Sequence, residues 1–137
     1  MNIPLIDKSN YLRGLLILAK KDNNISQIEK DIIYNVGVQL GFSSTFCQEI
    51  IKTLLQNECL NDDPIKFVNY SVAQSFVSDG LIISSTGKLI NATQLIWLKN
   101  LASINGIHMG WFRDELLKCN ANTNHLTSMK LSIYSMI

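Results

Sequence analysis

Apolar side chains recur every three or four residues along almost the whole chain, and no other feature of the sequence constrains the fold as strongly. In the first such stretch the spacing is carried by Tyr11, Leu12, Leu15, Leu16, Leu18 and Ala19. Residues three and four apart lie on the same face of an α-helix, so this stretch predicts a helix over about residues 8–21. The run Leu81-Ile82-Ile83 is the one fragment that resembles a β-strand. The spacing therefore predicts an all-α fold.

Two further helices begin with a capping box, in which two side chains satisfy the free backbone N–H groups of the first helical turn. Ser26 and Glu29 form the first box, and Asn91 and Gln94 form the second. Each helix is followed by a glycine, a residue that readily takes the left-handed conformation that ends many helices. These signals predict helices over about residues 26–40 and 91–105.

The remaining segments predict four more helices. One begins at Ser43, one at Asp63-Pro64, and two short ones span about residues 109–119 and 125–136. The first is expected to turn inward Phe46, Ile50, Ile51 and Leu54. The second is expected to carry Phe67, Val68, Val72, Phe76 and Val77 and to end near Asp79-Gly80 or one turn later. A chain of 137 residues has the usual length of one domain, so we predict a compact bundle of about seven helices in a single domain, residues 1–137.

The sequence also contains an internal echo. Residues 23–42 and residues 87–107 both read as a turn, a capped helix, a glycine and the start of another helix. Either a duplication or the convergence of two capped helices produces such an echo. If it is a duplication, the bundle consists of two quasi-repeated helix-turn-helix units.

Composition limits the partners that this chain can recognise. Apolar residues make up 47% and charged residues only 17%, and the formal net charge is +1. Such a chain has no overall field that attracts nucleic acid or an anionic membrane, whereas its sparse charge favours a protein partner or self-association. We expect leftover apolar positions, such as Ile133 and Met136 on the last predicted helix, to form the contact face.

Two absences in the sequence bear on location. The longest apolar run, Leu15 to Ala19, is far shorter than the roughly 20 residues that span a bilayer, so no membrane insertion is expected. The first ten residues lack the basic and apolar regions of a signal peptide, which predicts a cytoplasmic protein.

The residues that commonly carry chemistry are few and scattered. The three cysteines, Cys47, Cys59 and Cys119, include no C-x-x-C pair, which favours reduced, buried thiols over a disulfide framework or a zinc site. Neither His108 nor His125 lies at catalytic spacing from a cysteine or a carboxylate pair, so we predict surface or interfacial histidines. Trp97 and Trp111 are predicted to be core residues. The chain is therefore predicted to be non-enzymatic and to need no cofactor.

One polar turn could hold a cation. Asp22, Asn24 and Ser26 alternate like the first ligands of a calcium loop, although Gln27 and Ile33 stand where that loop has its glycine and its bidentate glutamate. The turn is either polar because it caps a helix, or it is a weak divalent-metal site. The metal ligands would be Asp22, Asn24 and Glu29.

Residues 35–50 also resemble a repressor-type helix-turn-helix, with Gly41 in the turn. The second helix of this motif would present Gln48 and Glu49, with Lys52 as its one cation. Phosphate neutralisation by cations supplies much of the affinity of DNA-binding proteins, so we expect only weak, unspecific binding to duplex DNA at physiological salt. A helix-turn-helix DNA-binding protein is the alternative function.

The same turn and helix resemble the TerB-like family of tellurite-resistance proteins, whose pattern is A-x-x-D-G-x-I-x-x-x-E followed by L-G. The matching residues here run from Ala19 to Glu29 and close with Leu40-Gly41. A second copy is similar from Gly87 to Ile107, with Thr93 at the position of the glutamate. The resemblance covers about residues 8–119. It implies an all-helical module that acts in stress or metal response or in protein interaction, as in the amino-terminal domain of membrane-anchored DnaJ-type co-chaperones.

Overall fold

The computed structural model describes residues 2–22, 25–56, 61–86, 88–121 and 131–137. The helices in these ranges are α1 (Leu5–Lys20), α2 (Gln27–Gln39), α3 (Ser44–Gln56), α4 (Tyr70–Ser84), α5 (Ala92–Ile104), α6 (Met109–Ala121) and the 3₁₀-helix η1 (Ser132–Ser135). These ranges contain no β-strand, and the β-like run 81–83 belongs to α4. The all-α prediction is confirmed. No described helix is long and apolar enough to cross a membrane.

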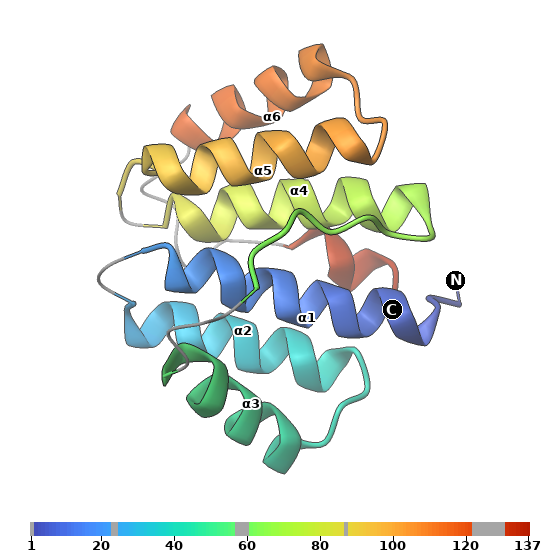
Figure 1. The fold of residues 1–137 in the computed structure, drawn as a ribbon, viewed down its shortest axis with the longest axis vertical. Helices are drawn as coiled ribbons and strands as arrows, with labels where there is room; N and C mark the ends of the chain where they lie inside the picture. The colour runs from blue at the N-terminus through green and yellow to red at the C-terminus, as the bar shows by residue number, and fades with distance from the viewer. Residues whose placement is uncertain (1, 23–24, 57–60, 87, 122–130) are drawn as a thin grey trace.

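The two helices α1 and α4 pack side by side at the centre of the molecule (Figure 1). Helices α2 and α3 lie on the outer side of α1, and α5 and α6 lie on the outer side of α4. The 3₁₀-helix η1 packs against α4 and reaches α2. Helices α1 and α4 are therefore covered by neighbours on several sides, and most of their side chains are buried.

The second three helices repeat the first three at a constant interval of 65 residues. Helix α4 begins at residue 70 and α1 at residue 5, α5 at 92 and α2 at 27, and α6 at 109 and α3 at 44. The two units meet where Tyr11 of α1 touches its counterpart Phe76 of α4, with ring centroids 5.2 Å apart in an edge-to-face arrangement. The sequence echo is therefore part of a longer structural repeat that includes the central helices.

Both predicted capping boxes are present and occupy equivalent positions in the repeat. The Glu29 amide donates to the Ser26 hydroxyl at 3.1 Å, and the Gln94 amide donates to the Asn91 side chain at 2.8 Å. Gln94, rather than Thr93, is thus the structural counterpart of Glu29, which corrects the alignment of the second TerB-like copy by one residue. The glycines that follow these helices, at positions 41 and 106, have the predicted positive φ angles of 105° and 73°.

The predicted helix start at Asp63-Pro64 is wrong. Residues 61–67 are not helical, and α4 begins only after Asn69, whose side chain caps it. Distant side chains take up the backbone groups of this segment instead: the Asp7 carboxylate accepts from the amides of Val68 and Asn69 at 2.8 and 3.0 Å. The Asn105 side chain accepts from the Phe67 amide at 2.9 Å and donates to the Ile65 carbonyl at 2.7 Å. These tertiary hydrogen bonds outweigh the local signal.

Two predicted inward residues face solvent. Phe46 is 44% exposed and packs on Phe42 with ring centroids 5.3 Å apart, whereas the next residue, Cys47, is fully buried. Val68 is 72% exposed because it precedes α4. Ile51 is buried as predicted, whereas Phe67, which was expected on a helix, is buried in the non-helical segment before α4. The Leu54 side chain lies outside the described part.

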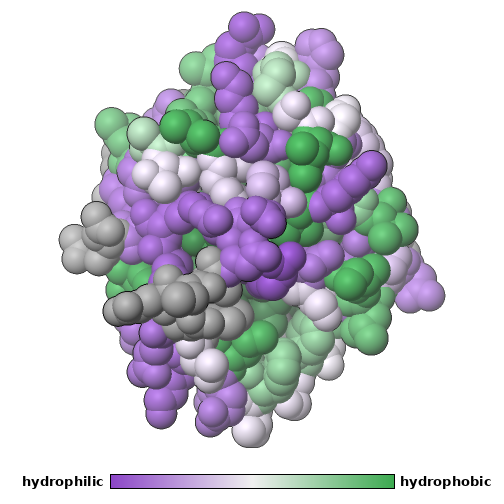
Figure 2. Space-filling model, viewed as in Figure 1, coloured by the Kyte–Doolittle hydropathy of each residue, from purple (hydrophilic) through white to green (hydrophobic). Residues whose placement is uncertain are grey.

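The end of the chain also differs from the prediction. Of the helix expected over 125–136, residues 125–130 lie outside the described ranges, and the rest forms only the short η1. Ile133 is fully buried and Met136 is half-buried, so the contact face expected from these two residues is not formed. The most exposed large apolar side chains of the described part lie instead at the start of α1 and in connections, namely Leu5, Val68 and Leu89. Figure 2 shows hydrophobic surface at the edge where Figure 1 places the starts of α1 and α4.

Most of the cysteines, tryptophans and histidines that the structure describes lie where the sequence predicts, in the core or on the surface. Cys47 and Cys119 are buried, reduced thiols, and Trp97 is buried with its indole N–H on the Asp62 carbonyl. His108 is exposed as expected. Cys59 and His125 lie outside the described residues. Trp111 is only half-buried, although it packs against the core.

Candidate functional site

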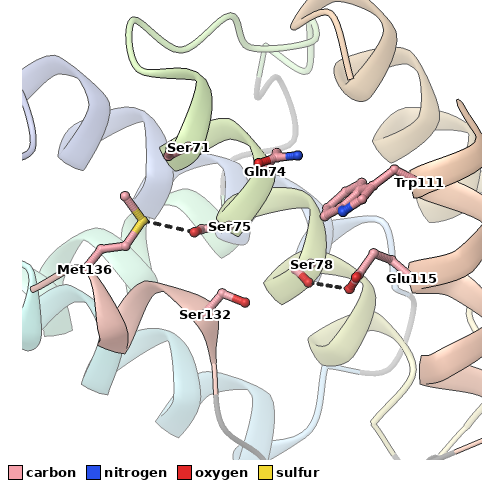
Figure 3. Close-up of a pocket in the computed structure, with 8 residues that line it drawn as sticks. All are labelled: Ser71, Gln74, Ser75, Ser78, Trp111, Glu115, Ser132 and Met136. Carbon is pink, nitrogen blue, oxygen red and sulfur yellow. Dashed lines mark hydrogen bonds between the residues drawn. The ribbon is translucent and has the colours of Figure 1, made fainter. Parts of the chain in front are cut away.

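A pocket of about 370 Å³ lies between α4, α6 and η1, three elements far apart in the sequence (Figure 3). Its lining residues are Ser71, Gln74, Ser75, Ser78, Trp111, Glu115, Ser132 and Met136. Ser71 is exposed and Gln74 and Trp111 are half-buried, so the pocket is open to solvent. The lining therefore combines four hydroxyls, an amide, an indole, a thioether and one carboxylate.

Helix α4 contributes the polar wall of the pocket. Ser71, Ser75 and Ser78 are spaced by four and three residues, which places them on one face of the helix. The opposite faces of α4 carry Val72, Phe76 and Val77, which are fully buried in the core. Serine is a mediocre helix former, so a serine face on a central helix is not explained by helix propensity.

Helix α6 contributes the charge and the aromatic ring. Trp111 and Glu115 are four residues apart and lie on the same side of α6, facing α4. The Ser78 hydroxyl donates to the Glu115 carboxylate at 2.6 Å, the short distance expected of a charge-assisted bond. The other carboxylate oxygen accepts from the exposed Lys118 ammonium at 3.2 Å.

The 3₁₀-helix η1 closes the third side of the pocket. Ser132 and Met136 face α4, and the Ser75 hydroxyl donates to the Met136 sulfur at 3.0 Å. A helix of this length has little stability of its own. Its position depends on a buried carboxyl group of α4, Asp79.

Asp79 holds η1 against the core. Its carboxylate accepts from the backbone amides of Ser132 and Ile133 at 2.6 and 3.1 Å and from the Tyr11 hydroxyl of α1. Burial raises the Asp79 pKa to about 6, although these hydrogen bonds, which favour the charged form, lower it in part. Burial and the nearby Asp79 charge also raise the Tyr11 pKa well above its ordinary value. One carboxyl group thus connects α1, α4 and the η1 wall of the pocket.

The lining presents several groups that can form hydrogen bonds with a ligand. The Trp111 indole N–H and the Ser71 hydroxyl have no hydrogen-bond partner among the described residues, and both are available to a ligand. The pocket therefore offers neutral donors and acceptors around one negative charge.

Two of the three residues predicted to bind a metal lie in the described part, and each has another partner there. The Asp22 carboxylate forms an ion pair with Lys88, a residue of the second repeat. Glu29 is buried and turns back on Ser26, and burial raises the Glu29 pKa. Asn24 lies outside the described residues. Within the described part, no three histidine, cysteine or acidic side chains gather as metal ligands would. The weak divalent site stays a prediction.

The two helices of the predicted helix-turn-helix are α2 and α3, which pack against each other across a short turn. The Phe42 amide donates to the Gly37 carbonyl at 3.1 Å, and Gly37 allows α3 to approach closely, since a Cβ there would lie 2.7 Å from the Cys47 sulfur. On α3, Gln48, Glu49 and Lys52 are exposed. The geometry is common to many helical hairpins, so DNA binding stays the alternative hypothesis.

Sequence reasoning missed the pocket. The spacing of Ser71, Ser75 and Ser78 was visible, but the partners on α6 and η1 depend on tertiary packing. Comparison with protein-family models, curated proteins and solved structures finds no match to this chain. The TerB-like resemblance stays a prediction.

Proposed function

We propose that this chain is a non-enzymatic helical module that binds another protein through the pocket between α4, α6 and η1. The observation that carries the proposal is the open, polar pocket itself, which three separate elements build around an indole and a carboxylate. Pockets that bind ligands combine apolar surface with a few convergent polar groups, and this lining has both.

The surroundings of the pocket favour a protein over a small molecule as the partner. Tyr70 is 50% exposed, and its hydroxyl accepts from the lining residue Gln74. Ile137, which follows the lining residue Met136, is 46% exposed. Exposed aromatic and aliphatic side chains beside a polar pocket extend the surface available for contact to the size of a protein interface. The sparse charge of the chain agrees with this proposal, as does the protein-interaction role that the TerB-like resemblance implies.

Site-specific photo-crosslinking in cells tests the proposal. A benzoyl-phenylalanine placed at Gln74 or Ser71 should form an adduct of one discrete mass, whose partner mass spectrometry then identifies. The matched control carries the same residue at Thr53, which is exposed on α3, a helix that contributes no residue to the pocket. The same adducts from all three positions, or none from the two pocket positions, would contradict the proposal.

A further inference from the structure

We infer that the pocket recognises a cation, namely the ammonium or guanidinium group of a lysine or arginine side chain that the partner protein presents. The inference rests on the proposed function, because it names the chemistry that the same pocket selects. Three observations support it: the charge of the lining, the position of the indole and the comparison with the first repeat.

Glu115 is the one charged residue among the eight that line the pocket. Its side chain is only 16% exposed, so an ionised carboxylate there is largely withdrawn from water and gains from a nearby positive charge. The remaining lining oxygens, from serines and Gln74, are acceptors that an ammonium or guanidinium group can use. An anionic ligand would meet this charge at close range.

Lys118 already supplies a cation to this carboxylate from outside the pocket. Its ammonium lies 3.2 Å from Glu115, three residues earlier on the same helix, and its side chain is 70% exposed. Exposed ion pairs of this kind contribute little to stability, so a ligand cation can replace Lys118 at small cost. The bond shows that Oε1 of Glu115, the oxygen that does not accept from Ser78, accepts an ammonium group.

Trp111 lies on the same helix face as Glu115, one turn earlier, and borders the same pocket. An indole ring attracts a cation to its face more strongly than the other aromatic side chains do. A carboxylate and an indole bordering one open pocket therefore favour a cationic group with an alkyl stem.

The first repeat shows that the fold does not need these residues. At the 65-residue interval, Glu115 corresponds to Ile50 and Ser78 to Arg13. The same helix framework thus forms with an isoleucine in place of the carboxylate and without the short bond between serine and glutamate. The polar set in the second repeat is accordingly a property of the pocket and not a requirement of helix packing.

A nuclear magnetic resonance titration of the whole chain tests the inference. The probes are Nα-acetyl-lysine methylamide, the arginine equivalent, and Nα-acetyl-norleucine methylamide, which has the same alkyl stem without the ammonium group. We expect the two cationic probes, at millimolar concentration, to shift the Trp111 indole and the amides of Ser78 and Ser132. The resonance of the Trp97 indole, which donates to the Asp62 carbonyl outside the pocket, should not shift.

Three variants sharpen the test. Glu115→Gln keeps the shape of the side chain but removes its charge. It should lower the affinity for the lysine probe roughly tenfold, as the loss of one charge-assisted contact implies. Asp114→Asn makes the same change of net charge at an exposed position of α6 and should leave the affinity unchanged. Lys118→Met removes the competing ammonium and should strengthen binding.

The inference would be overturned by norleucine and lysine probes that bind equally, or by pocket resonances that no probe shifts. Tighter binding of butylammonium chloride than of the lysine probe would also overturn it, because a free amine would then be the ligand. In each case the crosslinks from Gln74 and Ser71 decide the proposed function separately. A discrete adduct that persists in Glu115→Gln would leave the proposed function intact without its cation.

Discussion

The buried carboxyl group of Asp79 predicts a contribution to stability that grows as the pH falls from 7 to 4. The Asp79 pKa is about 6 in the folded chain against 3.8 for an ordinary aspartate. Between these values the folded chain holds one proton more than the unfolded chain, so each rise in pH lowers the free energy of unfolding. The two pKa values differ by about 2 units, which corresponds to roughly 3 kcal/mol.

Replacing Asp79 by asparagine isolates this contribution. The variant keeps the shape of the side chain but cannot titrate, and other acids act in both proteins and cancel in the difference. We expect the unfolding free energy of the native protein, minus that of Asp79→Asn, to fall by roughly 3 kcal/mol between pH 3.5 and pH 7. The amide nitrogen of the variant cannot accept a hydrogen bond from η1, so one buried backbone N–H there loses its acceptor. This loss lowers the stability of the variant at every pH and does not change how the difference depends on pH.

Urea unfolding at several pH values, followed by tryptophan fluorescence, measures the difference. A difference that is constant with pH would refute the reasoning. A difference that rises with pH would show that the donors on Tyr11, Ser132 and Ile133 outweigh burial and depress the pKa. In a Tyr11→Phe background the carboxylate loses one donor, so the fall should shift to higher pH.

Two further predictions concern the helix stop and the metal turn. Gly106 has a φ of 73° and open space where a Cβ would lie, so an alanine there is strained only in its backbone. Gly106→Ala should therefore lower the free energy of unfolding, measured by thermal melting, by roughly 1–2 kcal/mol. Gly106→Asn should lose less, since asparagine tolerates this conformation, and an equal loss in both would point to another cause. If the Asp22 turn binds calcium or magnesium, millimolar ion should move amide resonances of residues 20–30, and Asp22→Ala should abolish the effect. Lys88→Met should enhance it by removing a cation that pairs with the carboxylate. Unmoved resonances in the native chain and in Lys88→Met would rule the site out.

Local signals in the sequence predicted much of the helical framework. The boxes at Ser26 and Asn91 and the glycines at positions 41 and 106 act through backbone groups a few residues away, so neighbours in the sequence suffice to specify them. The echo between residues 23–42 and 87–107 followed from the same signals. The framework could therefore be read without any knowledge of the tertiary structure.

Local signals failed where distant groups compete for the same backbone. The sequence Asp63-Pro64 is a good helix start, yet Asp7 and Asn105 satisfy the amides of the following residues from α1 and from the end of α5. Nothing near Pro64 in the sequence reveals these partners. The start of α4 at Tyr70 was accordingly decided by the packing of the whole bundle.

The candidate site was decided almost entirely by tertiary structure. Glu115, Ser78 and Ser132 lie on three elements, and their convergence depends on the crossing of α4 with α6 and on the hold of Asp79 on η1. Helix periodicity states which residues share a face, but not which other face is packed against it. A capped helix is specified by its own few residues, whereas a pocket requires side chains that are distant in the chain to meet, and only the folded arrangement brings them together.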